Sequence, residues 1–257
     1  MPLLEGKKAL IFGIANHRSI GWAIAQALAA EGAQLAFSYQ ERMEKYVRDL
    51  AGKIPGTAVM ECDVQNDDQL DSAFAKASEI FNGTLDILIH SVAFAPPREL
   101  ENPFVETTRE GFHTALDISA YSLMAMARRA KPLLQASGGG SILTLTYMAS
   151  GRVMPKYNVM AVAKAALECS VRYLAFELGE HNIRVNAISA GALNTLAARG
   201  VSGFSSFREH TEAAAPLRRN IEQKEVGDAA LFLCSPLARA ITGEILFVDA
   251  GYNIMGA

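Results

Sequence analysis

Lys8-Ala9-Leu10-Ile11-Phe12-Gly13 is a short apolar run that ends in glycine, and Ile14-Ala15-Asn16-His17-Arg18-Ser19-Ile20-Gly21 leads from it into a helical pattern. A strand, a glycine-started loop and a helix in this order allow backbone N–H groups and a helix dipole to meet a pyrophosphate. The full G-x-G-x-x-G pattern is absent. Two interpretations are therefore open: a dinucleotide-binding turn that uses Gly13, Ser19 and Ile20, or a plain strand-to-helix turn in which Ser19 caps the helix.

Further apolar runs alternate with helical patterns along the rest of the chain. Most of these runs are continuously apolar, which is typical of strands buried on both faces of a parallel sheet. The expected strands are Lys8–Phe12, Gln34–Ser38, Ala58–Cys62, Ile87–His90, Ser141–Thr146, Arg184–Ile188 and Glu244–Val248, and the expected helices include Ile20–Ala30, Asp67–Phe81, Thr107–Leu134 and Tyr157–Gly179. The alternation predicts a single α/β domain over residues 1–257, built as a Rossmann-type doubly wound parallel sheet of about seven strands.

Composition and charge narrow the class of protein. The chain has 257 residues, half of them hydrophobic, and its formal net charge of -3 gives no reason to expect nucleic-acid binding. We find no signal-peptide core and no apolar run long enough to span a membrane, so we expect a soluble, cytoplasmic protein. Cys62, Cys169 and Cys234 are widely spaced, so we expect three buried thiols and neither a disulfide framework nor a metal site.

Polar or small residues follow most of the expected strands, at the sheet edge where such folds bind ligands. Gln40 follows the second strand and can hydrogen-bond a ribose 2′-hydroxyl without attracting a phosphate, which favours NADH over NADPH, although Arg42 is close in sequence. Residues after the other strands could reach adenine, the nicotinamide ribose, a carboxamide or phosphates: Asp63, Val64, Ser91, Val92, Ala93 and the segment Ser189–Thr195. Each of them alone is an ordinary strand end.

Tyr157 and Lys164 stand seven residues apart in a helical pattern. Two turns of helix would place both side chains on one face, roughly 10.5 Å apart along the axis. A phenol can donate a hydrogen bond to a developing oxyanion and an ammonium favours that charge, so the pair suits hydride-transfer chemistry. An ordinary helix with one buried tyrosine and one solvated lysine gives the same pattern.

Taken together, these segments resemble the short-chain dehydrogenase/reductase family over essentially the whole chain. Within it they are most similar to the bacterial enoyl-acyl carrier protein reductases of type II fatty acid synthesis. The resemblance rests on Gly13-x5-Ser19-Ile20, Cys62-Asp63-Val64, Phe94-Ala95-Pro96, Thr107-x-Arg109-Glu110-Gly111-Phe112, Asp117-Ile118-Ser119, Tyr147-x9-Tyr157-x6-Lys164 and Arg184–Gly191. The usual short-chain pattern has serine where this chain has Tyr147, and places tyrosine four residues before lysine, where this chain has Met160. Ala93, Ala192 and Asn194 also differ from the residues that many relatives carry.

The resemblance implies an active site. Tyr157 and Lys164 would be catalytic, with Tyr147 either a second proton donor or only a wall of the pocket. The cofactor would contact Gly13, Ser19, Ile20, Gln40, Asp63, Val64, Ser91, Val92, Ala93, Lys164, Leu193, Asn194, Thr195, Leu196 and Ala197. The substrate would contact Ala95, Tyr147, Tyr157, Met160 and Phe204. The implied reaction is reduction of a trans-2-enoyl thioester, carried on acyl carrier protein, to the saturated thioester, with NADH as cofactor and NADPH as a second candidate.

Two other functions fit most of these features. A ketone reductase of the same fold would share the cofactor site, but the shifted tyrosine and the missing serine argue against it. A dinucleotide-binding protein without catalysis would share the fold, but the intact Tyr157–Lys164 pair argues against that function.

The segment Asn194–Arg219 fits no strand and has only a weak helical pattern. Long excursions of this kind in compact domains are usually lids or binding loops, so we expect a helical substrate lid; a solvated helical insertion is the alternative. Its arginines could attract an acidic carrier protein: Arg199, Arg208, Arg218 and Arg219. The resemblance further implies a homotetramer and binding of diphenyl ether inhibitors.

Overall fold

The computed structural model describes residues 2–195 and 204–256. Within these ranges, parallel strands form one seven-stranded sheet in the order β3-β2-β1-β4-β5-β6-β7. The strands are β1 (Lys8–Phe12), β2 (Gln34–Tyr39), β3 (Ala58–Glu61), β4 (Ile87–His90), β5 (Gly140–Thr146), β6 (Ile183–Ala190) and β7 (Ile245–Val248). The strand order reverses between β1 and β4, the position at which doubly wound sheets bind ligands. The predicted fold class is confirmed.

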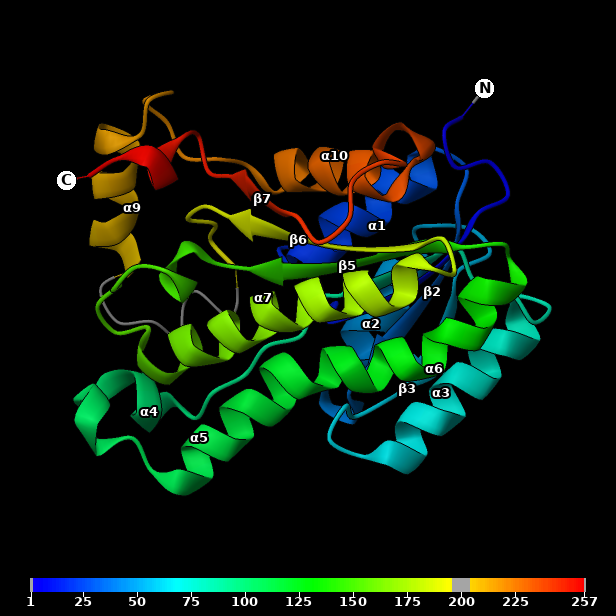
Figure 1. Ribbon diagram of the computed structural model, residues 1–257, viewed down its shortest axis with the longest axis horizontal. Coiled ribbons are helices and arrows are strands. Elements are labelled where there is room, and N and C mark those ends of the chain that lie inside the picture. The colour runs from blue at the N-terminus through cyan, green and yellow to red at the C-terminus, as the bar shows by residue number, and fades with distance from the viewer. Residues whose placement is uncertain (1, 196–203, 257) are drawn as a thin grey trace.

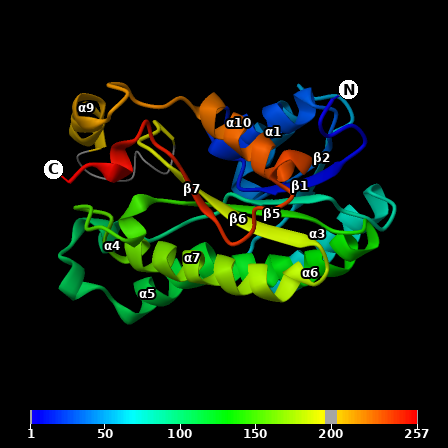
Figure 2. The ribbon, with the colours of Figure 1, turned by 45° about the horizontal axis from the view of Figure 1, so that its top comes forward.

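Helices cover both faces of the sheet, as Figure 1 and Figure 2 show. One face carries α1 (Ile20–Ala30), α2 (Glu44–Ala51) and α10 (Gln223–Cys234), and the other carries α3 (Asp67–Ile80), α5 (Arg109–Leu116), α6 (Ser122–Ala136) and α7 (Asn158–Gly179). Each face buries its own apolar cluster. Leu10 and Phe12 belong to one cluster and Ala9 and Ile11 to the other, because successive side chains of a strand point to opposite faces.

Shorter elements complete the described chain. Figure 1 shows α4 (Pro97–Glu101) and α9 (Phe204–Ala214) beyond the end of the sheet where the central strands finish. The single turns are η1 (Glu41–Met43), η2 (Phe104–Glu106), η3 (Asp117–Tyr121), η4 (Met148–Ser150), η5 (Pro236–Ala238) and η6 (Tyr252–Ile254). Among the described residues, no helix is both long and apolar enough to cross a membrane.

The expected elements match the observed ones closely, with specific exceptions. The bounds of β1, β4 and α1 agree in full, and the other expected strands differ by one or two residues at their ends. The sequence prediction omitted α2, α4 and α10. Helix α10 had a usable signal, because Val226, Ala230 and Leu233 are buried at helical spacing after a capping box formed by Glu222 and Glu225. The expectation of three buried thiols is wrong for Cys169, which is exposed on α7.

The expected helix Thr107–Leu134 is interrupted by a π turn. Helix α5 begins at Arg109, the π turn η3 spans Asp117–Tyr121, and α6 continues to Ala136. Two serines stabilise this irregularity. Ser122 donates its hydroxyl to the Ile118 carbonyl over 2.6 Å, and Ser119 accepts from the Phe94 N–H at 3.0 Å. The π turn is therefore attached to the segment that follows β4.

Gly13 lies where the loops after β1 and β4 meet. Its φ of +93° is a conformation that favours glycine, and a Cβ built on it would lie 1.9 Å from the Ser91 carbonyl oxygen. The Ser91 N–H also donates to the Phe12 carbonyl over 3.0 Å. The first loop and the end of β4 are thus in direct backbone contact, which only a residue without a side chain permits.

We expect Gly13→Ala to lower the free energy of unfolding by about 2–4 kcal/mol, because the methyl group must displace the Ser91 backbone while φ stays unfavourable. Urea denaturation followed by circular dichroism measures this change. The matched control is Gly151→Ala: Gly151 has a φ of -118°, and no described atom outside its immediate neighbours lies within 4 Å of its built Cβ. Equal destabilisation by the two substitutions would contradict the role given to Gly13.

Candidate active site

Most of the predicted site residues gather at the carboxyl edge of the sheet. Gly13 follows β1, Gln40 follows β2, Asp63 lies just beyond β3, Ser91 follows β4 and Tyr147 follows β5. The segment Gly191–Thr195 continues from β6. Leu196 and Ala197 lie outside the described residues. Phe204 begins α9, but its side chain lies outside what the structure describes.

The loop between β1 and α1 is held from within by Ser19. Its hydroxyl oxygen accepts hydrogen bonds from the N–H groups of Ala15 and Asn16, each at 3.0 Å. Ser19 occupies the N-cap position of α1, but among the described residues the expected side-chain capping bond to the first turn is not formed. The hydroxyl instead orders the loop, and the dipole of α1 still points toward this loop from Ile20.

The end of β2 carries an amide and a guanidinium side by side. Arg42 donates from Nη2 to Oε1 of Gln40 over 3.1 Å. The residue expected to read the ribose hydroxyl is thus in contact with the one that could read a phosphate. Nearby, Tyr39 donates its hydroxyl to Glu44 over 3.1 Å and Arg48 donates to the Tyr39 oxygen over 3.1 Å, which fixes the strand end.

The ends of β3 and β4 are ordered by short local bonds. Asp63 accepts the Gln65 N–H at 3.0 Å, and its own N–H donates to Gln69 over 2.7 Å. Ser91 and Val92 are half-buried and Ala93 is exposed, so the chain becomes accessible to solvent within three residues of the end of β4. Ala95 then turns inward and joins a small apolar cluster with Met160 and the partly buried Tyr157. Three of the expected substrate residues are therefore brought together.

Tyr147 and Tyr157 face one another across the start of α7. Their ring centroids lie 5.0 Å apart, and the ring planes are tilted by 59°. Helix α7 begins at Asn158, one residue later than expected, and Tyr157 immediately precedes it. Asn158 has a φ of +40°, in the left-handed region. Asn158 stabilises this entry by donating from its amide to the Leu100 and Asn102 carbonyls at 3.2 and 2.8 Å. Helix α7 is thereby attached to α4.

Lys164 is buried two turns along α7. Only 5% of the residue is exposed, and Nζ donates to the Leu145 carbonyl at the end of β5 over 2.8 Å. Burial lowers the pKa of Lys164 to about 8, and the Glu168 carboxylate opposes that shift. The solvated lysine of the ordinary-helix interpretation is therefore wrong. A lysine buried in this way belongs to the kind of perturbed group that marks functional sites.

Burial also raises the pKa of both tyrosines. The pKa of Tyr157 is raised by burial alone, and that of Tyr147 is raised by burial and then by the Tyr157 and Tyr252 phenols and the Asp249 carboxylate. Both phenols consequently keep their protons at neutral pH. They are suited to donate hydrogen bonds to an oxygen that gains negative charge.

His90 is a buried group that the sequence prediction missed. Its Nδ1 lies 2.8 Å from the Thr144 hydroxyl and its Nε2 lies 2.7 Å from the Ser122 hydroxyl. Ser122 donates its own hydroxyl proton to the Ile118 carbonyl, and the Thr144 hydroxyl donates to the His90 carbonyl over 3.2 Å, so the two hydroxyl groups tie the ring to neighbouring elements at both nitrogens. Burial, and next the Lys164 ammonium, lower the pKa of His90 to about 3, so the ring is neutral. No local sequence signal predicts this network, because Ser122 and Thr144 lie 32 and 54 positions after His90 in the chain.

The C-terminal turn is a second feature without a sequence signal. The Tyr252 ring packs edge-on against Phe207 and His210 of α9, with centroids 6.0 and 6.1 Å away. Arg152, in the loop before α7, donates to the Met255 carbonyl over 2.8 Å. The end of the described chain therefore contacts both α9 and the loop that leads to Tyr157.

The described part of the segment expected to form a helical lid contains α9 and two arginines with partners inside the chain. Helix α9 spans 11 residues, which agrees with the helical part of that expectation although the sequence pattern was weak. Arg219 forms two hydrogen bonds to the Glu225 carboxylate, at 2.8 and 2.6 Å, and Arg218 donates to the Ala213 carbonyl. Arg199 lies outside the described residues. The Arg219–Glu225 ion pair reduces the positive charge that the segment offers to a partner.

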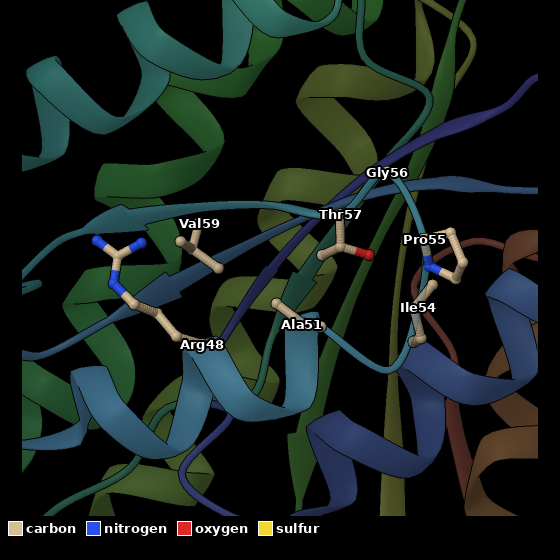
Figure 3. Close-up of a pocket in the computed structure, with 8 residues that line it drawn as sticks. Arg48, Ala51, Ile54, Pro55, Gly56, Thr57 and Val59 are labelled. Carbon is tan, nitrogen blue, oxygen red and sulfur yellow. The ribbon is translucent and has the colours of Figure 1, made fainter.

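A separate cavity of about 340 Å³ lies between α2 and β3 (Figure 3). It is lined by Arg48, Ala51, Gly52, Ile54, Pro55, Gly56, Thr57 and Val59. Its lining includes none of the predicted site residues. The Arg48 guanidinium is paired with Glu44 at 2.8 Å and lies over the Tyr39 ring, 5.4 Å from its centroid. This cavity is therefore separate from the carboxyl edge of the sheet, where the predicted site residues lie.

A doubly wound sheet with a tyrosine and a buried lysine at its carboxyl edge defines a dinucleotide-dependent oxidoreductase of the short-chain class. The family model described as enoyl-(acyl carrier protein) reductase matches residues 13–253. The chain belongs to the enoyl-acyl carrier protein reductase family.

Relatives cover the chain almost from end to end. The chain is 52% identical to the enoyl-[acyl-carrier-protein] reductase [NADH] FabI of Nostoc sp., and the match covers 98% of each chain. It is 51% identical to the enoyl-[acyl-carrier-protein] reductase [NADH] FabI of Bacillus cereus, and that match covers 100% of each chain. Solved structures agree. The Bacillus cereus enzyme with NADP+ and indole naphthyridinone has a TM-score of 0.97 at 50% identity over 100% of both chains. The Anaplasma phagocytophilum enzyme with NAD has 0.95 at 45% identity, over 99% of this chain and 97% of that one.

Proposed function

We propose that the Tyr147, Tyr157 and Lys164 side chains form the catalytic centre for NADH-dependent reduction of trans-2-enoyl thioesters on acyl carrier protein. The saturated acyl thioester of type II fatty acid synthesis is the product. The observation that carries these roles is the buried Lys164 ammonium, held on the Leu145 carbonyl two turns after a tyrosine that keeps its proton. Burying an ammonium costs free energy unless it is paired or hydrogen-bonded, and groups whose pKa is strongly shifted in this way cluster at functional sites.

The residues at the sheet edge fit a dinucleotide. The loop after β1 closes on Ser91 so tightly at Gly13 that it leaves no room for a side chain, and α1 begins directly behind it. We infer that this loop holds the pyrophosphate, Gln40 and Arg42 the adenosine ribose, Asp63 and Val64 the adenine, and Ser91–Ala93 the nicotinamide end. Ile20 and the segment Leu193–Ala197 complete the cofactor contacts.

The bound cofactor supplies a hydride to the β-carbon of the enoyl group. Negative charge would then develop on the thioester oxygen as an enolate, and a proton taken up from water at the α-carbon would complete the saturated thioester. Tyr157 donates a hydrogen bond to that oxygen, and its effect is largest in the transition state, where the charge develops. Lys164 binds the nicotinamide ribose hydroxyls and adds positive charge. Ala95, Met160 and Phe204 surround the acyl chain.

The seven-residue spacing follows from the substrate. In a conjugate addition the oxygen that gains charge lies three bonds from the carbon that accepts hydride, whereas in a ketone it lies one bond away. The phenol must therefore reach further from a ribose-bound lysine. Tyr157, at the start of α7, lies two turns from Lys164 and gives that reach. The position one turn from Lys164 is occupied by Met160, which has no hydroxyl group.

Tyr147 shapes the pocket wall opposite Tyr157. Its hydroxyl could be a second donor to the substrate only if it shared the thioester oxygen with Tyr157. The tilted contact between the two rings is compatible with that role and with a role as pocket wall alone. The same aromatic wall, above the nicotinamide, is where we propose that diphenyl ether inhibitors bind when NAD+ is present. The segment 194–219 acts as the lid over this wall.

The assembly is a homotetramer in this proposal. Large apolar side chains are exposed on both helical faces of the sheet and would be buried between copies of the chain. They include Tyr121, Met124, Tyr173 and Phe176 on one face and Phe232 on the other. We place the enzyme in the cytoplasm, where acyl carrier protein brings the substrate.

We expect rapid NADH oxidation with crotonyl thioester and at least about 100-fold lower kcat/KM with acetoacetyl thioester, because only the enoyl oxygen lies where Tyr157 reaches. NADPH should be used less well than NADH, since Gln40 does not attract a phosphate. The loss of absorbance of the reduced nicotinamide measures the rate for each of the two thioesters with each of the two cofactors, NADH and NADPH. Efficient reduction of the ketone would identify a carbonyl reductase, and no oxidation with any enoyl thioester would indicate a protein without catalysis.

A further inference from the structure

Three consecutive residues at the end of β5 each make a polar contact around Lys164. Thr144 bonds His90, the Leu145 carbonyl accepts from Lys164, and Thr146 donates its hydroxyl to Oε1 of Glu168 over 2.6 Å. The two threonines point to the same face of the sheet because they are two positions apart. This face is the one covered by α7. The end of β5 thus holds a neutral ring, an ammonium and a carboxylate in one group.

Glu168 stands on the same face of α7 as Lys164. Four residues separate them, so their side chains are neighbours one turn apart. The short bond from Thr146 keeps the half-buried Glu168 carboxylate at the sheet instead of letting it turn to solvent. Lys164 itself donates to a carbonyl, which carries no charge. Glu168 is therefore the anion placed to balance the buried ammonium.

Several other charged groups on the elements packed against α7 are bound to partners of their own or are exposed. Asp117 of η3 accepts from Gln65, Glu99 of α4 accepts from Thr108, and Arg129 of α6 pairs with Asp67 and Asp71. Arg109, Glu110 and His113 of α5 are exposed. Of the groups close to Lys164, His90 is neutral because burial and the Lys164 ammonium lower its pKa, and the Tyr147 and Tyr157 phenols keep their protons.

We propose that Glu168 is a positioning residue that keeps Lys164 in its charged form while the cofactor and substrate are bound. This inference rests on the role given to Lys164 above. A fixed carboxylate one turn away offsets part of the cost of burying the ammonium. Without it, Lys164 would lose its proton at a lower pH, and cofactor binding and turnover would both fail earlier as pH rises.

The test is the pH dependence of NADH binding, measured by fluorescence titration, together with the pH profile of turnover on crotonyl thioester. In the unmodified protein, both should decline through a high-pH limb as Lys164 deprotonates. In Glu168→Gln, which keeps the shape and removes the charge, the midpoint of that limb should move down by about 0.5–1 pH unit. Glu168→Asp, which keeps the charge, should restore most of the midpoint.

Two further variants separate electrostatics from packing. Thr146→Val removes the hydroxyl that fixes the carboxylate and should move the midpoint in the same direction by a smaller amount. Glu177→Gln removes an exposed carboxylate from the same helix and should leave the midpoint in place. If Glu168→Gln does not fold, as judged by circular dichroism, Glu168→Asp and Thr146→Val still give the comparison.

An unshifted midpoint in Glu168→Gln, or equal shifts in Glu168→Gln and Glu177→Gln, would overturn the proposal and leave the role of Lys164 intact. A different result would overturn the underlying assignment. If Lys164→Ala keeps the same high-pH limb in NADH binding as the unmodified protein, then Lys164 is not the titrating group, and both inferences fail together.

Discussion

Tyr157→Phe should lower turnover on crotonyl thioester about 100- to 1,000-fold, the scale observed when one oxyanion donor is lost. The ring would remain, so the packing against Tyr147 and the apolar cluster with Ala95 and Met160 should be kept. The lost hydroxyl is the donor to an oxygen that becomes negative only during the reaction. NADH affinity should therefore change little, and the loss should appear in kcat more than in KM.

The measurement is steady-state kinetics with NADH and crotonyl thioester, combined with NADH titration by fluorescence. Tyr46→Phe is a matched control, because Tyr46 is an exposed tyrosine on α2. Turnover that is unchanged in Tyr157→Phe and strongly reduced in Tyr147→Phe would transfer the donor role to Tyr147.

Lys164→Ala should weaken NADH binding by about 10- to 100-fold, because a hydrogen bond from a charged group to the ribose is lost. Turnover should fall further, since the positive charge near the enolate is lost as well. Calorimetry gives the NADH affinity directly. Lys76→Ala is a suitable control, because Lys76 is exposed on α3. Native NADH affinity in Lys164→Ala would show that the ribose contact is wrong.

The pH dependence of the unmodified protein follows from the same lysine. Its pKa is lowered to about 8, so the ammonium predominates below that pH and is lost as pH rises through it. Because the charged form is the active one, NADH binding and turnover should decline above about pH 8. A decline on the acidic side would require another group, since His90 stays neutral down to about pH 3.

The sequence predicts the sheet well because most of the strands are largely apolar runs that stand out from the helical patterns between them. It also predicts the place of the site, because parallel strands bring Gly13, Gln40, Ser91 and Tyr147 to one edge whatever the loops do. The spacing of Tyr157 and Lys164 predicts the chemistry that we propose. These inferences depend only on periodicity and topology.

The remaining features depend on contacts between distant parts of the chain. The His90 network joins three elements, and no local pattern indicates which hydroxyls will meet the ring. Ser19 bonds its own loop instead of α1, a choice between two nearby sets of N–H groups that composition does not decide. Glu168 is different, because its place four residues after Lys164 was a readable signal of a charge pair.

The π turn between α5 and α6 has a consequence for the orientation of the whole helix. A π turn contains one more residue than a regular turn, and one residue corresponds to about 100° of rotation about the helix axis. The side chains of α6 are therefore out of phase with those of α5 by more than a quarter turn. The first segment packs on α7, while the second packs on α3, α7 and the strands. A change of phase, rather than a loop, lets one continuous helix present different faces to the substrate region and to the core.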